Sequence, residues 1–266
     1  MHYLVSASLQ QTAHNIPYDA HNARFQQKER ELLEWKGVFD FPEKTIQERL
    51  LDVYFQTFHP NFPIFNRGDF FRRLEEKTIS PLVLHAVYFL SATHCDMALI
   101  SDAGFSSRQE ARLTFYKRAK ALFDADYEAD AIANMQALFL ISFWWGGALD
   151  QKDTWHWLGA AISLAQSKGL HRSTKGSDLS PTDQRLWKRI WWSIYVRDRH
   201  AASALGRPMR IHDDECDVEM LEESDFEDDV DSGRVSGIET RELALYVIQM
   251  TKLSVLRRCS YRNAVC

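Results

Sequence analysis

The sequence predicts an all-α fold, a multi-helix bundle of antiparallel helix pairs, and three observations support this prediction. Apolar residues recur at helical spacing in successive segments, which are bounded by capping residues, glycine and proline. No stretch of useful length alternates between apolar and polar residues, as a half-buried strand would. The segment 185–211, RLWKRIWWSIYVRDRHAASALGRPMRI, holds three tryptophans and seven Lys or Arg residues and follows the helical period.

The chain divides into four parts by composition. Its 266 residues are enough for one large helical domain. Residues 1–27 are polar and aperiodic, which predicts a disordered N-terminal segment. A helical domain is expected over residues 28–211, an acidic loop over 212–236, and a further helix with a C-terminal tail over 237–266.

Capping residues and breakers predict the helix boundaries. Thr45 and Glu48 have the spacing of a capping box, and Pro81 follows Ser80 as a first helical residue. Gly169 stands where a left-handed residue would end a helix. Helices are expected over residues 28–36, 45–59, 67–77, 81–100, 107–124, 131–148, 153–168, from 181 onward, and 237–258.

The tryptophan-rich helix has one broad apolar face. At about 100° per residue, its large apolar residues share one arc, and most of its basic residues lie opposite. This predicts a helix docked on a core with its charges in water, because a DNA-reading helix would carry fewer large apolar groups. Trp192 and Val196 lie on the charged side, which indicates further neighbours there. The apolar arc holds Leu186, Trp187, Ile190, Trp191, Ile194 and Tyr195, and the opposite side holds Arg185, Lys188, Arg189, Arg199 and His200.

Composition argues against several classes of protein. The net charge is −5, whereas a domain that binds nucleic acid by itself is expected to carry a basic excess. The cysteines form no CxxC pair, so we expect reduced thiols in an intracellular protein, and the N-terminus is not a convincing signal peptide. Residues 131–149 carry no charge, but a buried helix explains them better than a membrane span. The cysteines are Cys95, Cys216, Cys259 and Cys266.

No pattern in the sequence predicts catalysis or metal binding. His94, Cys95 and Asp96 are consecutive, so they cannot all face one ion from a helix, and His156 stands alone on a packed helix. The sequence has no GxSxG, Walker or Cys-His signature. We therefore expect no catalytic, metal-binding or DNA-contacting residue in this chain and no enzymatic activity. The acidic loop is read as solvated, with a short partner-binding segment as the alternative.

Asp198 is a charge within the apolar arc of the tryptophan-rich helix. A buried carboxylate needs a partner, because an unpaired buried charge is costly. Arg207 lies nine residues further on, after the turn at Gly206. We therefore expect a buried structural pair between Asp198 and Arg207, or between Asp198 and another arginine such as Arg172.

Five blocks of sequence, in order, resemble the regulatory domain, or middle homology region, of fungal zinc-cluster transcription factors. They include YFQTFHPNFPIFNRGDF (54–70), NMQALFLIS (134–142), DTWHWLGAAISLAQSKGLHRS (153–173), the segment 185–211, and the acidic DDECDVEML (213–221). The amino-acid sequence of these blocks is most similar to the cutinase and fatty-acid-responsive branch of the family. The family motif falls on Trp155, Gly159, Gly169, His171, Arg172, Trp191, Trp192, Asp198, Gly206, Arg207 and Pro208.

The resemblance implies a nuclear regulator of RNA polymerase II transcription that acts through intramolecular contacts, protein partners or a homodimer. The family's six-cysteine cluster, which holds two zinc ions and binds DNA, has no counterpart here, so DNA binding and zinc are expected only from a separate module. The family domain also continues beyond the acidic loop, so the bundle is expected to be truncated at its C-terminus, with an apolar patch on the Trp192 face.

Two other functions remain open from the sequence. The first is a free-standing interaction protein that titrates full-length partners as a dominant-negative form. The second is a sensor with a pocket among the apolar helices of residues 131–168 and 186–195 for a fatty acid or an aromatic inducer.

Overall fold

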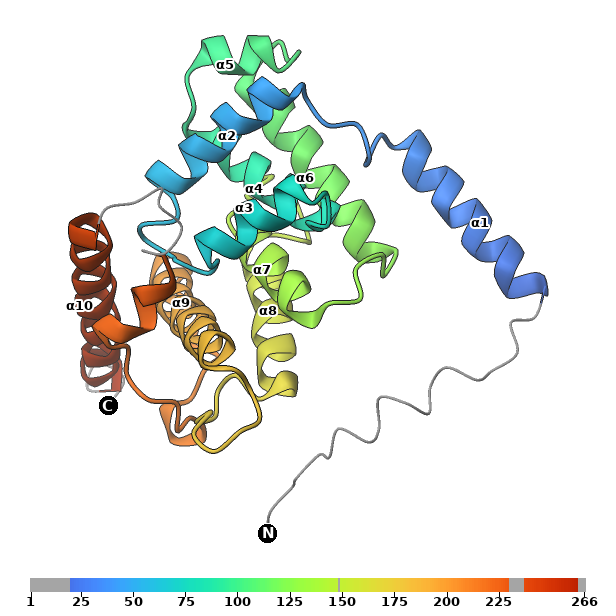
Figure 1. Ribbon diagram of the computed structural model, residues 1–266. Helices are drawn as coiled ribbons and strands as arrows, with labels where there is room; N and C mark the ends of the chain where they lie inside the picture. Colours follow the sequence, from blue (N-terminus) through green and yellow to red (C-terminus); the bar gives the residue numbers. More distant parts are fainter. Residues whose placement is uncertain (1–19, 148, 230–236, 263–266) are drawn as a thin grey trace.

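The computed structural model describes residues 20–147, 149–229 and 237–262. The all-α prediction is confirmed, since all regular elements among these residues are helices (Figure 1). They are α1 (Ala20–Trp35), α2 (Lys44–Thr57), α3 (Arg67–Glu75), α4 (Pro81–His94), α5 (Met97–Asp102), α6 (Arg108–Asp124), α7 (Ala131–Ile141), α8 (Thr154–Lys168), α9 (Pro181–Leu205) and α10 (Gly237–Arg262), with short 3₁₀ helices η2 (Asp213–Glu215) and η3 (Glu223–Asp229).

The N-terminal helix begins earlier than its composition suggested. Residues 20–27 belong to α1, so the predicted disordered segment 1–27 is wrong over these eight positions. Residues 1–19 lie outside the described part of the chain. Leu33 and Val38 are buried at the end of this helix and after it, which anchors the segment on the bundle. Residues 20–27 thus continue a helix whose other end is anchored by burial, although their polar composition carries little helical signal.

Two expected caps differ in the structure. Helix α2 begins at Lys44 with Glu43 as its N-cap, and no side chain caps it, so the predicted capping box of Thr45 and Glu48 is wrong. Ser80 likewise makes no side-chain cap bond, although Pro81 is at the first turn of α4 as expected. The expected cap at Gly169 is confirmed, and α9 begins at residue 181 as expected, with the Ser180 side chain as its N-cap.

The long apolar helix predicted over residues 81–100 is two helices. Cys95 is extended and ends α4, and the side chain of Asp96 accepts a hydrogen bond from the Leu99 amide at 2.7 Å, which starts α5. A local N-cap thus interrupts a continuous apolar pattern.

The uncharged stretch 131–149 is likewise not one helix, because α7 ends at Ile141 and the chain then turns. Trp144 donates from its indole nitrogen to Asp150 at 2.7 Å, and Thr154 donates to the Trp144 carbonyl, so side chains hold the turn. Among the described residues, no helix is long and apolar enough to cross a membrane.

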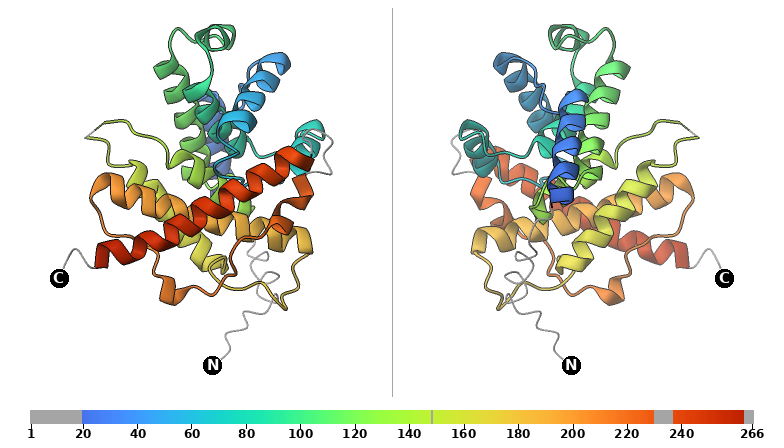
Figure 2. Two further views of the ribbon diagram at one scale, coloured as in Figure 1. Left: turned by 90° about the vertical axis from the view of Figure 1, so that its left-hand side faces the viewer. Right: turned by 90° about the vertical axis from the view of Figure 1, so that its right-hand side faces the viewer.

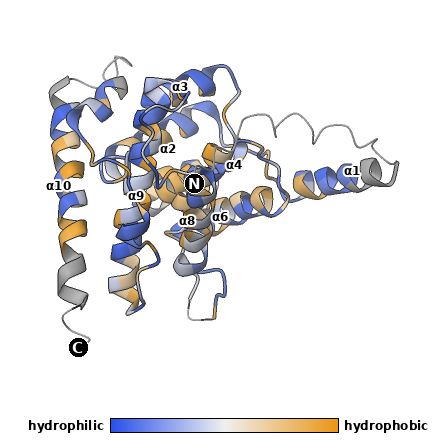
Figure 3. Ribbon diagram, turned by 90° about the horizontal axis from the view of Figure 1, so that it is seen from below, coloured by the Kyte–Doolittle hydropathy of each residue, from blue (hydrophilic) through white to orange (hydrophobic). Residues whose placement is uncertain are grey.

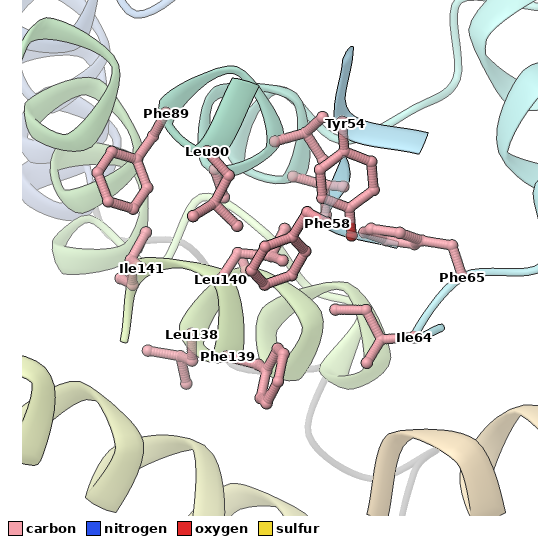
Figure 4. Packing of buried hydrophobic residues seen from close by; sticks show 14 of the residues in the cluster. Tyr54, Phe58, Ile64, Phe65, Phe89, Leu90, Leu138, Phe139, Leu140 and Ile141 are labelled. Atoms are coloured by element: carbon pink, nitrogen blue, oxygen red, sulfur yellow. The ribbon is translucent and has the colours of Figure 1, made fainter. Parts of the chain in front are cut away.

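Helix α4 is the centre of the core. Every residue from Leu82 to Ala92 is buried, because α2, α6 and α7 all pack around this helix. Figure 4 shows the junction, with Phe58, Leu90 and Phe139 brought together from three segments. Gln136 of α7 donates to the Ile64 carbonyl at 2.7 Å, so the linker before α3 is tied to this core.

Helices α8, α9 and α10 form a second layer. Helix α8 packs on α7 and α9, and α10 crosses over α9 (Figure 2). Helix α1 lies on the side of the molecule away from α10 (Figure 1). As a result, α9 lies between the core layer and α10.

Candidate interaction site: helix α9 and the acidic segment

Helix α9 is covered on both of its faces. Ile190, Trp191, Ile194 and Tyr195 of the expected apolar arc are buried, and Leu186 and Trp187 are half-buried at its start. On the opposite side, Trp192 is 8% exposed and Val196 6% exposed. The prediction of a core helix with neighbours on both sides is therefore confirmed, and a free apolar patch on the Trp192 face is wrong.

The sequence suggested that the basic residues of this helix lie in water, but two of them are buried. Arg189 is 1% exposed and Arg199 is 3% exposed. The guanidinium of Arg199 lies over the Tyr195 ring, 3.4 Å from its centroid, and that of Arg189 lies 5.8 Å from the Phe226 centroid. Both are covered because the chain after α9 folds back over this face, which helix periodicity cannot reveal.

The segment that folds back is the acidic segment, which we define as residues 212–229. Its carboxylates meet the basic and polar groups of α9. Asp213 accepts from Arg199 at 2.8 Å and from the Tyr195 hydroxyl at 2.7 Å. Asp225 forms an ion pair with Lys188 at 2.9 Å. The acidic segment is thus a partner of α9 within the same chain. The prediction of a solvated loop is wrong for Asp213 and Asp225, whereas residues 214–215 and 222–224 are exposed as expected.

Apolar anchors accompany these ion pairs. Leu221 and Phe226 are 3% and 0% exposed, and the indole nitrogen of Trp192 donates to the Glu219 carbonyl at 2.8 Å. Burial of two large side chains stabilises the docked segment more than solvated ion pairs do. These two apolar side chains therefore anchor the acidic segment to the domain.

The turn after α8 holds the other edge of the acidic segment. The Ser173 hydroxyl donates to Glu219 at 2.6 Å, and the Asp217 amide donates to the His171 carbonyl at 3.2 Å. Arg172 and Asp217 lie 3.6 Å apart, and both are exposed. Solvent screening weakens such a pair, so the hydrogen bonds position this edge.

Asp198 is fully buried and pairs with an arginine, as expected, but the arginine is Arg199 and neither of the two named candidates, Arg207 and Arg172. Its carboxylate accepts from Arg199 at 3.1 Å and from the backbone amides of Arg210 and Ile211 at 3.0 and 3.1 Å. Burial raises the pKa of Asp198, and these donors act in the opposite direction. The buried carboxylate therefore fixes the path of the backbone that returns after the turn at Gly206.

Arg207 and Arg172 are used elsewhere. The guanidinium of Arg207 lies 3.8 Å from Asp153 and 5.3 Å from the centroid of the Trp155 ring, whereas Arg172 faces Asp217. Arg207, nine residues from Asp198 in sequence, therefore points to the start of α8, because Arg199 and backbone amides already bind the Asp198 carboxylate.

Gly159 leaves room for the side chain of Arg210, a contact that the sequence did not predict. A Cβ atom at position 159 would lie 1.6 Å from Nη1 of Arg210. The Arg210 guanidinium lies across α8, 4.1 Å from the centroid of the Trp155 ring. Glycine inside a helix is unfavourable by itself, so this close approach gives it a reason. Trp155, Gly159 and Asp198 are thus brought together around Arg210.

The remaining motif residues shape the chain around this site. Gly169 and Gly206 end α8 and α9 with φ of 84° and 62°, the left-handed region that glycine tolerates. His171 lies 5.9 Å from Trp191 between ring centroids, and burial lowers its pKa, with Arg172 adding to the effect. Pro208 is exposed. These residues are structural in this fold.

Sequence reasoning missed four participants, namely Arg199, Arg210, Asp213 and Asp153. The sequence held a signal for Arg210 alone, since a glycine inside a helix, here Gly159, indicates that a side chain or backbone comes close to it. The others form contacts between segments that only the fold brings together.

The arrangement offers ion pairs and hydrogen bonds rather than a reactive centre. Within the described ranges, no group of three or more His, Cys, Asp or Glu residues is placed to hold a metal ion. Cys95 and Cys216 are free thiols, and burial raises the pKa of each. Cys266 and the side chain of Cys259 lie outside the described part. The site therefore has the chemistry of a contact between segments.

Comparison with known families agrees with this architecture. The chain matches the fungal specific transcription factor domain over residues 51–256, a range that includes α9, the acidic segment and most of α10. The chain therefore belongs to that family. Since the family regulates transcription and is not enzymatic, this chain is a domain of a fungal transcription regulator and not an enzyme.

Particular relatives confirm the expected similarity to the cutinase branch. The chain is 43% identical to the cutinase transcription factor 1 alpha of Fusarium vanettenii over 211 residues, which cover 78% of this chain. It is 41% identical to the 1 beta factor of the same organism over 203 residues, or 74% of this chain. Both alignments span 23% of the relative's length. No solved structure matches the chain.

Proposed function

We propose that this domain is the regulatory, or middle homology, domain of a nuclear transcription factor that controls RNA polymerase II transcription. The burial of α9 supports this proposal. Its tryptophans and two of its arginines face other parts of the domain, so they are not available to read base edges. DNA contacts and zinc then belong to a separate module, and this domain acts through intramolecular or partner contacts.

The surface of α10 supports contacts with protein. Among the described side chains of this helix, the four large apolar ones that are exposed lie within about 100° of helix circumference. Figure 3 shows the hydrophobic residues along this helix. Exposed apolar groups gathered on one face are typical of association sites, so a second copy or another protein segment is expected there. These residues are Leu245, Tyr246, Leu253 and Leu256, which are 40 to 66% exposed.

The test is a titration of the purified chain against duplex DNA across a salt series, with zinc measured on the same sample. The proposal predicts no bound zinc and only weak binding that is insensitive to sequence and is lost as salt rises. Tight binding to one sequence over others would overturn it, because a DNA-reading surface would then exist within this chain.

A second experiment separates a regulatory domain from a free-standing interaction protein. The chain is fused to an unrelated DNA-binding domain and tested on a matching reporter in a fungal cell. A regulatory domain changes reporter output when attached. A dominant-negative protein changes nothing in the fusion, but lowers the output of a full-length relative when it is expressed beside it.

A further inference from the structure

A groove opens where α10 meets the core layer, at a place different from the pocket expected within residues 131–168 and 186–195. It has a volume of about 470 Å³ and is lined by the ends of α2 and α4, by α9, by Phe143 after α7, and by α10. Ligand sites are typically of 300 to about 1,000 Å³ and are mostly apolar, and this groove meets both criteria.

Aromatic rings form one wall of the groove. Phe58 and Phe143 are in edge-to-face contact with centroids 4.9 Å apart, and Phe62 lies 5.5 Å from each of them. Leu90 lies beside Phe58 in this wall (Figure 4). Three mutually tilted phenyl rings suit a further ring, since aromatic pairs prefer offset or edge-to-face geometry at these separations. The wall therefore favours an aromatic body over a flexible chain.

The polar part of the lining contains no carboxylate. It consists of hydroxyl, amide and imidazole groups, and the hydroxyls of Thr57 and Thr93 already donate to carbonyls of their own helices. His94 and His200 contribute imidazole nitrogens. The lining therefore contributes no negative charge to the groove, although the chain as a whole has a net charge of −5.

Arginines without acidic partners surround this lining. Among the described residues, Arg108, Arg112 and Arg197 form no ion pair. Arg108 donates to the Thr93 carbonyl at 2.8 Å, and Arg197 lies 3.8 Å from the Phe143 centroid. Burial lowers the pKa of the His94 imidazole, which lines the groove, and the nearby charges of Arg108 and Arg112 lower it further. The local potential is therefore positive and suits an anion.

Helix α10 closes the groove from outside. It contributes Tyr246 and Met250, and the Tyr246 hydroxyl donates to Oδ1 of Asn61 at 3.1 Å. The main contacts of α10 are otherwise with α9 and η3. A molecule in the groove would therefore add contacts between α10 and the core layer.

We propose that this groove binds a compact aromatic carboxylate, with its ring against the three phenylalanines and its carboxylate on the side of His94 and His200. Its binding stabilises the docked position of α10. The site itself rests on the geometry above, and its use as a regulatory input rests on the proposed function.

The test uses 2-naphthoate as the probe, titrated into the purified chain by calorimetry. Two further probes resolve the chemistry: 2-naphthalenemethanol keeps the ring without the charge, and decanoate keeps the charge without the ring. We expect 2-naphthoate to bind about tenfold more tightly than either, since a charge-assisted hydrogen bond and a ring contact are each lost in turn. Absence of 2-naphthoate binding, or equal affinity for decanoate, overturns the proposal.

Substitutions in the groove test whether 2-naphthoate binds there. Met250→Trp fills the groove from α10 and is expected to weaken 2-naphthoate binding at least about tenfold, whereas Met97→Trp, on an exposed Met of α5, leaves it unchanged. Thr57→Trp at the rim of the groove gives the same test and is expected to change the stability little, because Thr57 is exposed. Thr78→Trp, at another exposed threonine, is its control. Unchanged affinity in a folded groove variant contradicts the assignment.

The charge and the coupling to α10 are tested separately. Arg112→Gln is expected to weaken 2-naphthoate several-fold while leaving 2-naphthalenemethanol unchanged, and Arg30→Gln on α1 affects neither. Bound 2-naphthoate is expected to slow amide exchange in α10, and unaltered exchange would overturn the coupling. Because these readouts come from the purified chain, a chain that binds 2-naphthoate but leaves the reporter unchanged would contradict only the proposed function.

Discussion

Asp198 is surrounded by donors from two directions of the chain. Arg199 comes from its own helix, and the amides of residues 210 and 211 come from the segment that returns after the turn. A carboxylate that accepts backbone amides specifies one geometry of that return, because only a negatively charged acceptor satisfies all the donors at once. Its burial is therefore a structural constraint on the turn and on Arg210.

Asp198→Asn should lower the free energy of unfolding by about 2 kcal/mol, since the amide keeps one acceptor oxygen but loses the charge that faces Arg199. Urea denaturation gives this difference directly. Asp217→Asn, which alters an exposed pair with Arg172, is the matched control and should change stability by less than about 0.5 kcal/mol. Equal effects of the two substitutions would contradict the structural role of Asp198.

Burial at His85 predicts a loss of stability in acid. Its ring is fully buried, donates from Nε2 to the Val38 carbonyl at 2.7 Å and stacks on Phe41. Burial lowers its pKa from 6.5 to about 3. The unfolded chain therefore takes up a proton between pH 6.5 and 3 while the folded chain does not, so stability falls as the pH falls, by about 1.4 kcal/mol per unit from this group.

His85→Gln keeps a donor for the Val38 carbonyl but cannot titrate. Thermal unfolding followed from pH 7 to pH 5 should show a shallower decline in this variant than in the unmodified chain. The same decline in both would mean that His85 does not contribute. The exposed His212 is the control position, because His212→Gln should leave the decline in place.

At the scale of elements, the acidic segment completes α9. Without it, Trp192, Lys188 and Arg199 would stand on an open basic and aromatic surface, which is how the segment 185–211 reads in isolation. With it, these groups face Glu219, Asp225 and Asp213 of the same chain. A surface that looks suited to a polyanion is thus occupied by an internal anionic partner.

A double-mutant cycle measures this docking. Lys188→Met and Asp225→Asn should show a coupling free energy of about 1 kcal/mol, because the Asp225 side chain is only 6% exposed and water screens the pair weakly. Arg241 and Glu223 form an exposed pair that joins α10 to the same segment, and their coupling should be below about 0.5 kcal/mol. Chemical denaturation of the seven proteins in the two cycles gives both numbers, and similar coupling in the two pairs would contradict the docked geometry.

At the scale of the whole molecule, two layers meet across α7, α8 and α9, and α10 lies on the outside. Its inner side is buried on α9 and η3, whereas Leu253 and Leu256 are 55% and 66% exposed. Apolar exposure of this kind favours association when a complementary surface is available.

We therefore expect the purified chain to associate in a concentration-dependent manner, as light scattering coupled to size exclusion would show. Leu253→Gln with Leu256→Gln should shift the population toward the monomer without lowering the melting temperature by more than a few degrees, because neither side chain is buried. Leu32→Gln, on α1 at the other side of the molecule, should leave association unchanged. Unaltered association in the α10 variant would place the contact elsewhere.

Local sequence determined much of the fold. The helical period, the caps at Ser180 and Gly169 and the apolar arc of α9 depend on residues within a few positions of one another, so they can be read without the tertiary structure. The same locality explains the errors. A cap at Asp96 divides α4 from α5 within a continuous apolar stretch, and α1 extends back to Ala20 through residues of polar composition.

The helical class, the core face of α9, the burial of Asp198 and the family of the chain can therefore be read from the amino-acid sequence. The partners of Asp198, the burial of Arg189 and Arg199, the docking of the acidic segment and the groove beside α10 follow from the folded arrangement. The physical reason is the range of the interactions. Helix formation and capping act over one or two turns, whereas a buried charge takes whichever donor the folded chain brings within about 3 Å.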